Sequence, residues 1–261
     1  AKNMRYVHVV CDPDDYNALA AQLPQGLSMQ ARKQLATKAF MHTQRYDHAI
    51  CQYLNKQSPL PALLAQNQTA LRYGENPHQS ASSYRLDQEG FSILDATVHQ
   101  GKELSYNNLL DADAAYSQVC AFDYPACVVV KHTQACGVAQ DTTHTTALKK
   151  AYQADSLSAF GGIVALNGAL DEAAAEFLSD KFLEVIIAPE YTEAARGILA
   201  QKKNLRVLDT HGQVLDSKNH HRLLHNALLV QQRDRSKITI EDITPVTKKK
   251  NHQAYKKDIA F

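Results

Sequence analysis

The sequence predicts an α/β fold, and three observations lead to that prediction. Short runs of β-branched and aliphatic residues recur in the part of the chain from residue 70 onward. Segments whose apolar residues repeat at helical spacing separate these runs, and glycine, proline, asparagine and aspartate stand between the two kinds of segment. This β-α-β-α order is typical of a sheet with helices packed on both faces, which is a three-layer α/β/α arrangement.

A helical arm is expected before the α/β part. Its elements are a strand over residues 6–10, a helix over residues 13–23 and a long helix over residues 28–54. Pro13 suits the first turn of a helix, and Ser28 is a good N-cap for the long one, whose apolar residues follow a 3.6-residue period. Pro59 and Pro61 should stop this helix.

The α/β part then follows in order. Strands are expected over residues 92–98, 126–130, 162–166, 185–188 and 205–208, and helices over residues 109–121, 142–154, 171–182 and 192–200. The run Val128–Val130 lies between Pro125 and Gly137, and three consecutive β-branched residues predict a fully buried strand of the kind found inside parallel sheets. A turn containing Gly137 should follow it.

The composition places few limits on function. The chain has 261 residues, 44% of them hydrophobic and 21% charged, and a formal net charge of +1, so no overall field points to nucleic acid or to a membrane. No apolar run approaches the length of a membrane-spanning helix. The five cysteines are odd in number and include no C-x-x-C pair, which indicates a reducing compartment and hence the cytoplasm.

Lys131 and His132 follow directly after the predicted buried strand. In open α/β sheets the ligand crevice lies beyond the carboxyl ends of the strands, so this pair is expected at a binding edge. Both side chains can also simply solvate the end of the strand, and the two residues alone leave these readings equally open.

Two further segments could bind a ligand. Arg72 and Tyr73 lie in LRYGENPHQ, where a guanidinium fork suited to phosphate stands beside a hydroxyl group; a surface loop is the alternative. The segment SAFGG ends in Gly161 and Gly162, which allow a ligand to approach the backbone closely, although a chain reversal alone would also need them.

Other polar residues have simpler explanations. Asn107 or Asn108 can be the N-cap of the helix that follows, and Glu184 is an acid just before a buried strand, where most such acids are solvated. The motifs of a zinc-dependent deaminase, a serine hydrolase, a P-loop and a dinucleotide-binding turn do not occur.

Six ordered motifs together resemble one family, the bifunctional purine biosynthesis enzymes in which AICAR transformylase is joined to IMP cyclohydrolase. They are LRYGENPHQ, GKELSYNNLLDADAA, VVVKHTQACGVA, SAFGGIVALN, VIIAPEYTEAA and KKNLRVL. The resemblance covers residues 2–261. It implies that residues 1–69 are a strand and helical arm following a missing cyclohydrolase domain. Residues 70–261 would be the first of two cytidine deaminase-like units of the transformylase domain, without zinc, the second unit being absent. Residues 256–261 look like the opening of a helix, and both ends look cut.

The resemblance also implies a reaction, the transfer of a formyl group from 10-formyltetrahydrofolate to the 5-amino group of AICAR in purine biosynthesis. His132 matches the family's catalytic histidine, and Lys131 the lysine that supports the oxyanion and the departing folate nitrogen. The matches to substrate-binding positions are Arg72 and Tyr73 for the nucleotide, and Asn108, Gly161 and Glu184 for the AICAR base or ribose. Lys2 would be a remnant of the cyclohydrolase site. No metal is required, and the family implies a homodimer.

Two departures from the family pattern leave alternatives open. Many bacterial relatives have Asn-Pro where this chain has Gln134-Ala135, and glycines near His225–Ala227. A non-catalytic paralogue that binds a nucleotide or a protein partner is therefore the second reading, and an unrelated α/β binding module is a remote third.

Overall fold

The structure, a computed structural model, describes residues 1–55, 65–86, 90–215, 219–234, 236, 239–242, 244 and 246. These fall into two compact units, unit 1 over Ala1–Gln66 and unit 2 over Asn67–Phe261. The predicted helix stop at Pro59 and Pro61 and the predicted helix opening at residues 256–261 lie outside the described residues.

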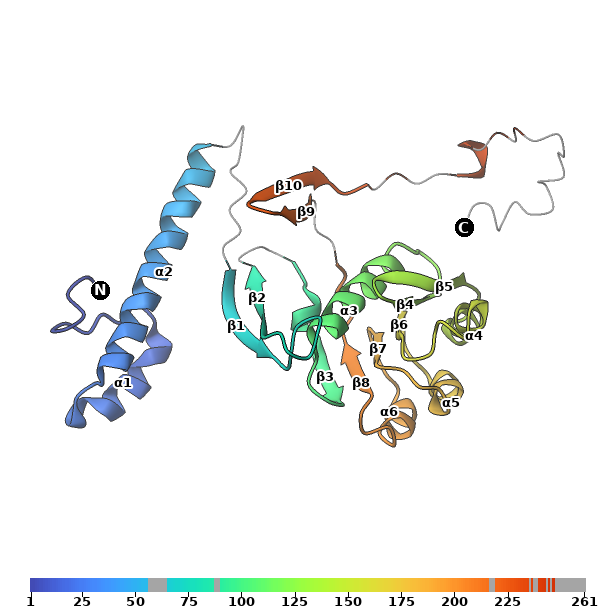
Figure 1. The fold of residues 1–261 in the computed structure, drawn as a ribbon, viewed down its shortest axis with the longest axis horizontal. Helices are drawn as coiled ribbons and strands as arrows, with labels where there is room; N and C mark the ends of the chain where they lie inside the picture. Colours follow the sequence, from blue (N-terminus) through green and yellow to red (C-terminus); the bar gives the residue numbers. More distant parts are fainter. Residues whose placement is uncertain are drawn as a thin grey trace. The chain divides into compact units, whose positions relative to one another are not determined.

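Unit 1 contains the predicted helical arm (Figure 1). Its α-helices are α1 (Tyr16–Gln22) and α2 (Met29–Leu54). Ser28 is the N-cap of α2, since its hydroxyl accepts the Ala31 N–H at 3.1 Å, as its residue type predicted. The Lys38 ammonium forms ion pairs with Asp12 at 2.6 Å and Asp15 at 2.8 Å, and so fastens the segment around α1 to α2.

The strand predicted over residues 6–10 is wrong, because these residues form no regular element. Tyr6 is 79% exposed and Val7 is 48% exposed. A strand needs a neighbour for its backbone hydrogen bonds, and the elements described in unit 1 ahead of residue 65 are helical. The alternation of residue types in a sequence does not show whether such a neighbouring strand is present.

Unit 2 is built on a six-stranded sheet with the order β3-β8-β7-β6-β4-β5 (Figure 1). The strands are β3 (Thr97–Gln100), β4 (Ala126–Lys131), β5 (Gln134–Gln140), β6 (Ile163–Leu166), β7 (Val185–Ala188) and β8 (Arg206–Asp209). β6, β7 and β8 are parallel, whereas β4 is antiparallel to both of its neighbours and β3 is antiparallel to β8.

Helices cover both faces of this sheet, as the sequence predicted. They are α3 (Tyr106–Val119), α4 (His144–Ala154), α5 (Glu172–Ser179) and α6 (Glu193–Leu199). Alternate residues of β4 point to opposite faces: Cys127 and Val129 belong to the cluster with α4, α5 and α6, while Val128 belongs to the cluster with α3.

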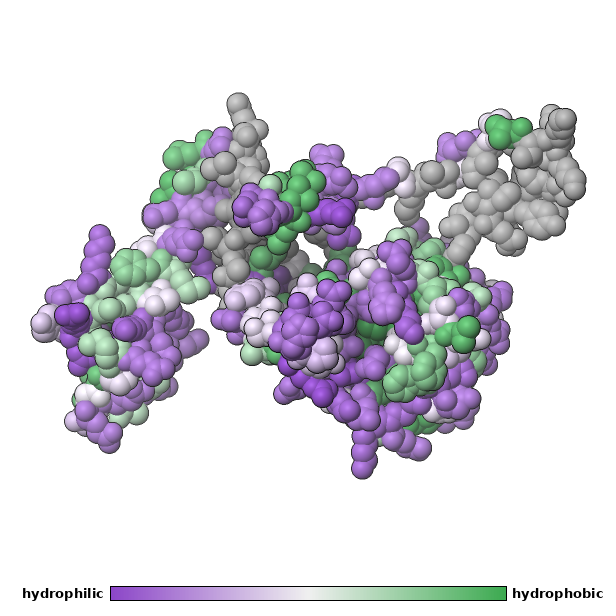
Figure 2. All heavy atoms as spheres, viewed as in Figure 1, coloured by the Kyte–Doolittle hydropathy of each residue, from purple (hydrophilic) through white to green (hydrophobic). Residues whose placement is uncertain are grey.

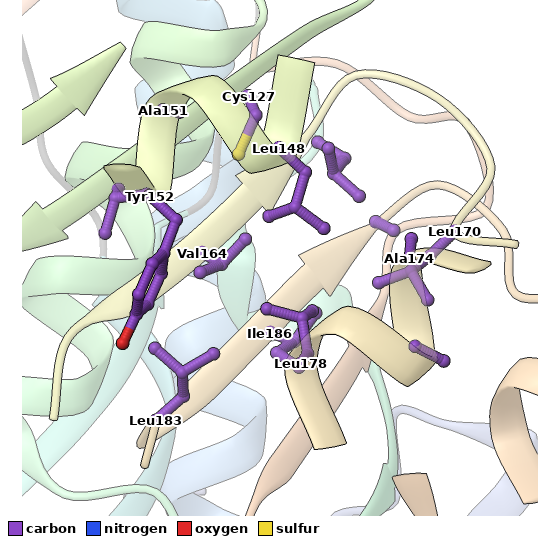
Figure 3. Packing of buried hydrophobic residues seen from close by; sticks show 14 of the residues in the cluster. Cys127, Leu148, Ala151, Tyr152, Val164, Leu170, Ala174, Leu178, Leu183 and Ile186 are labelled. Atoms are coloured by element: carbon purple, nitrogen blue, oxygen red, sulfur yellow. The ribbon is translucent and has the colours of Figure 1, made fainter. Parts of the chain in front are cut away.

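Figure 3 shows the first of these clusters, in which Leu148 of α4 and Leu178 of α5 pack near Val164 and Ile186 of the sheet. Each fully buried aliphatic side chain contributes about 1.5–3 kcal/mol to stability. The α/β fold with a preceding helical arm is confirmed.

β4 is buried as predicted, but its surroundings differ from the prediction. It lies between two antiparallel neighbours and not inside a parallel sheet. The sequence could not predict this, because an apolar run reports burial on both faces and carries no information about strand direction. The turn predicted around Gly137 is strand β5 instead. A Cβ at Gly137 would lie 1.9 Å from the Ala151 carbonyl oxygen, so this glycine allows α4 to pack closely on β5.

The strand predicted over residues 92–98 is only partly right. Ile93–Asp95 is a 3-10 turn with Ser92 as its N-cap, and the strand β3 starts at Thr97. Two hairpins were not predicted. They are β1 (Ala65–Leu71) with β2 (Ala81–Leu86), and β9 (Asn219–Leu224) with β10 (Ala227–Gln232). Figure 2 shows hydrophobic residues on the second hairpin, where Leu223 is 77% exposed.

Candidate functional site

Lys131 and His132 lie at a tight turn between β4 and β5. Lys131 ends β4 and pairs with Gln134 of β5, so His132 and Thr133 form a two-residue turn. Both have left-handed backbones, with φ of 54° and 62°. Such a pair is typical of type I′ hairpin turns, in which asparagine and glycine are strongly preferred. The turn places the exposed His132 side chain at the tip of the hairpin.

A carboxylate on α3 holds this turn. The Asp111 side chain accepts the His132 N–H through Oδ2 at 3.2 Å and the Thr133 N–H through Oδ1 at 2.7 Å. Hydrogen bonds to an ionised acceptor are stronger than neutral ones. The turn is therefore attached to the helix and to the strands.

Lys131 connects the end of β4 to the segment before β6. Its Nζ donates to the Phe160 carbonyl at 2.8 Å. The next residue, Gly161, has a φ of +71°, a conformation that favours glycine, and its N–H donates to the Phe182 carbonyl at 2.8 Å. The SAFGG segment thus lies between Lys131 and the start of β7.

Glu184, just before β7, is paired with an arginine. Its N–H donates to the Gly162 carbonyl at 3.1 Å, and its carboxylate accepts from Arg206 Nη1 at 2.5 Å. The Arg206 side chain is only 5% exposed, whereas that of Glu184 is 38% exposed. Arg206 also donates to the carbonyls of Lys102 and Glu103 at 3.1 Å each, so it links β7 and β8 to the segment before α3.

The Arg72 loop is connected to the same helix. The exposed Arg72 guanidinium lies 5.4 Å from the centroid of the Tyr73 ring, a cation–π arrangement. The Gly74 N–H donates to the Gln79 carbonyl at 2.8 Å and closes the loop. Asn107 Nδ2 then donates to the Glu75 carbonyl at 3.2 Å, which ties the loop to the first turn of α3.

The N-cap of α3 is Ser105, so the prediction of Asn107 or Asn108 as the cap is wrong. Ser105 Oγ accepts the Asn108 N–H at 3.2 Å, and Asn108 Oδ1 accepts the Ser105 N–H at 3.1 Å. This reciprocal capping box satisfies two backbone donors that the start of a helix would otherwise leave without partners. It also buries Asn108 and fixes its side chain.

Strand direction explains why these segments meet. Because β4 is antiparallel to β6, its carboxyl end lies beside the amino end of β6, where Val130 pairs with Ile163. The amino ends of β7 and β8 lie along the same edge. The predicted site residues therefore lie at the amino ends of the three parallel strands. The crevice rule for parallel sheets concerns their carboxyl ends, so the location of the binding site stays a prediction.

The structure brings most of the predicted residues together. Lys131, His132, Gly161 and Glu184 lie along this edge, and Arg72, Tyr73 and Asn108 join it through α3. Lys2 is exposed and belongs to unit 1, so it stays a prediction.

Sequence reasoning missed Asp111 and Arg206. An arginine at the first position of an apolar strand was a usable signal for Arg206, since a charge there must find partners. No comparable signal marked Asp111, because an acid on a helix is usually solvated.

The thiol of Cys136, in strand β5, is a poor nucleophile. Cys136 Sγ lies 3.5 Å from the Val129 carbonyl oxygen, and burial raises the pKa of this thiol. It therefore stays protonated at neutral pH.

The residues that the structure describes include no group of three or more His, Cys, Asp or Glu side chains placed to hold a metal ion. Within the same part of the chain, no helix has both the length and the apolar character needed to cross a membrane.

Comparison with known proteins identifies relatives over the whole chain. The "Bifunctional purine biosynthesis protein PurH" of Anaeromyxobacter dehalogenans is 44% identical over 284 residues, covering 100% of this chain and 54% of that protein. The protein of the same name from Acidithiobacillus ferrooxidans is 48% identical over 220 residues, covering 80% of this chain and 42% of that protein. The chain thus spans about half the length of the curated relatives it matches.

A solved structure is similar over a smaller part. The dCMP deaminase from cyanophage S-TIM5 covers 38% of this chain and 94% of its own, with 11% identity and a TM-score of 0.30, too low to support an inference about function. The two purine biosynthesis proteins do not favour the reading of a non-catalytic paralogue. The family model of the AICARFT/IMPCHase bienzyme matches residues 1–261, and the chain therefore belongs to that family.

Proposed function

We propose that this chain carries the nucleotide site and the proton-transfer residues of an AICAR formyltransferase, which transfers a formyl group from 10-formyltetrahydrofolate. One observation carries the proposal. Segments from separate motifs meet along one edge of the sheet: Lys131 donates to the carbonyl of Phe160, next to Gly161, and the Glu184 N–H donates to the carbonyl of Gly162. The description of the matched family, the AICARFT/IMPCHase bienzyme, supports the same reaction, and the names of the relatives support a role in purine biosynthesis. The second activity, IMP cyclohydrolase, and a cyclohydrolase origin of Lys2 are part of the proposal for the longer protein.

The reaction requires a base close to the attacking amine. The AICAR amino group is a weak nucleophile, because its lone pair is delocalised into the ring. When its nitrogen attacks the formyl carbon, the C–N bond forms and the amine must lose a proton. His132 is exposed at a fixed hairpin tip and accepts this proton in the proposal.

The second requirement is stabilisation of charge on the formyl oxygen. The Lys131 ammonium donates to this oxyanion while the tetrahedral intermediate exists. The carbon–nitrogen bond to the folate then breaks, and the departing folate nitrogen takes up a proton. Among the residues that the structure describes, the Lys131 ammonium donates to one backbone carbonyl, that of Phe160, which a stronger anionic acceptor can replace.

Binding roles fall to the surrounding residues. Arg72 and Tyr73 hold the nucleotide, with Arg72 at the phosphate, since a guanidinium fork matches phosphate oxygens. Asn108, Gly161 and Glu184 contact the base or ribose. We further propose that the complete protein is a homodimer in the cytoplasm. Residues 70–261 are then the first of the two units of its transformylase domain.

The test uses steady-state kinetics on a chimera in which the remaining segment of the Anaeromyxobacter dehalogenans relative follows this chain. His132→Ala should lower kcat by roughly 10²–10⁴-fold with little change in the KM for AICAR, because a base acts only in the transition state. Arg72→Ala should mainly raise that KM, because a phosphate contact serves the ground and transition states alike.

His225→Ala is the matched control, since it removes an exposed histidine at the turn between β9 and β10. It should leave both constants unchanged. Near-normal kcat in a folded His132→Ala protein would refute the catalytic assignment. A chimera that binds AICAR without transferring the formyl group would instead favour the non-catalytic reading.

A further inference from the structure

The His132–Thr133 turn adopts a conformation that its own residues disfavour. Both residues have positive φ, 54° and 62°. Thr133 is β-branched, and a β-branched residue with positive φ is a genuine outlier. A turn of this type with neither asparagine nor glycine persists only if its surroundings hold it in place.

Asp111 supplies that support from a rigid part of the fold. Its two carboxylate oxygens accept two consecutive N–H groups, those of His132 and Thr133, at 3.2 and 2.7 Å. The adjacent Ala112 is fully buried, as is Ala115 one turn further along α3, so the helix carrying the carboxylate is packed into the core. The Asp111 side chain thus ties the turn to α3, in addition to the strands β4 and β5 on either side of it.

We propose that Asp111 is the positioning residue for His132: it holds the turn in its left-handed conformation and so sets where the imidazole lies. The inference has two parts. The effect of Asp111 on catalysis, its functional half, rests on the proposed formyl transfer. The effect of Asp111 on the turn, its structural half, concerns this chain alone. A base displaced by about 1 Å can cost up to 100-fold in rate, so the conformation of the turn matters to catalysis.

The structural half is tested by NMR on the 261-residue chain, with backbone chemical shifts and couplings reporting φ at His132. Asp111→Ala removes both acceptors and should shift His132 away from positive φ. Asp113→Asn is the matched control, because it changes a carboxylate two residues along the same helix, on a different face. It should leave the turn unchanged.

A rescue variant separates positioning from general destabilisation. Glycine adopts positive φ without strain, so Asp111→Ala combined with Thr133→Gly should return His132 to positive φ. In the chimera, Asp111→Ala should lower kcat by roughly 10- to 100-fold with a smaller change in KM, and the double variant should recover most of this loss.

The two proposals fail in different ways. A wild-type chimera without formyl transfer would refute the proposed function, while the NMR result would still decide whether Asp111 holds the turn. An unchanged turn in Asp111→Ala would overturn the inference even if the enzyme is active. So would a kcat loss that the Thr133→Gly change does not recover, because that loss would be general destabilisation.

Discussion

Arg206→Met should destabilise unit 2 more than any other single change at the site edge. The guanidinium, 5% exposed, donates to the Glu184 carboxylate and to the carbonyls of Lys102 and Glu103. Methionine fills a similar apolar volume but donates nothing. The substitution therefore isolates the polar contacts of Arg206 from its packing.

The magnitude follows from the kinds of contact that are lost. A neutral hydrogen bond contributes about 1 kcal/mol, and one to a charged group about 1.5–3 kcal/mol. The carboxylate is 38% exposed and regains water when its partner is removed, so its loss falls at the low end of that range. Because the charged guanidinium is the donor in all three bonds, they sum at the low end of about 1.5 kcal/mol each to about 4.5 kcal/mol. For a domain of this size that corresponds to roughly 9–18 °C in Tm.

The assay is urea denaturation followed by circular dichroism, because the chain has no tryptophan to report by fluorescence. Arg206→Lys keeps the charge without the planar fork and should show a smaller loss. Arg196→Met is the control, since it makes the same change at an exposed arginine of α6 and should stay within about 0.5 kcal/mol. An Arg206→Met protein that is as stable as this control would refute the reasoning.

Three further predictions concern packing and ionisation. Gly137→Ala should destabilise by about 1–3 kcal/mol in urea denaturation, because the new Cβ would lie 1.9 Å from a backbone oxygen of α4, whereas Gly197→Ala in open space should not destabilise. Burial raises the pKa of Tyr116 to about 12, whereas the phenol of the unfolded chain ionises at about 10. The free energy of unfolding should therefore fall as the pH rises above about 10, and it should fall less in Tyr116→Phe. Burial raises the pKa of Cys127 as well, so thiol reagents should label exposed Cys51 first and Cys127 only on unfolding, as mass spectrometry would show.

Local patterns predicted much of the fold. The helices α2 to α6 and the strands β4, β6, β7 and β8 all lie close to their predicted ranges. Their signals are local ones: an N-cap such as Ser28, a 3.6-residue period, or a continuous apolar run between turn residues. Each signal reflects either the burial of one face of an element or the hydrogen bonding of its backbone. Both depend on residues within a short segment, so both can be inferred from the sequence.

Other elements depended on partners that local patterns do not specify. Residues 6–10 have a strand-like composition but pair with no strand among the described residues, whereas Gln134–Gln140 forms β5 because a two-residue turn returns it alongside β4. The Gln134-Ala135 pair, a departure from the family pattern, pairs as the start of this strand with Lys131 and Val130. A proline at residue 135 would lack the backbone N–H that a strand offers.

The sequence by itself determined the α/β class, the helical arm, the position of Lys131-His132 at the end of a buried strand, and the family resemblance. Only the tertiary structure decided that β4 runs antiparallel to β6, which places the pair at the amino ends of the parallel strands. It also decided that Asp111 meets residues 21 and 22 positions away, and that Arg206 meets Glu103, 103 positions away. The physical reason is that hydrophobic periodicity specifies which face of an element is buried, while the direction of neighbouring strands and the partners of buried charges are settled only when the layers pack together.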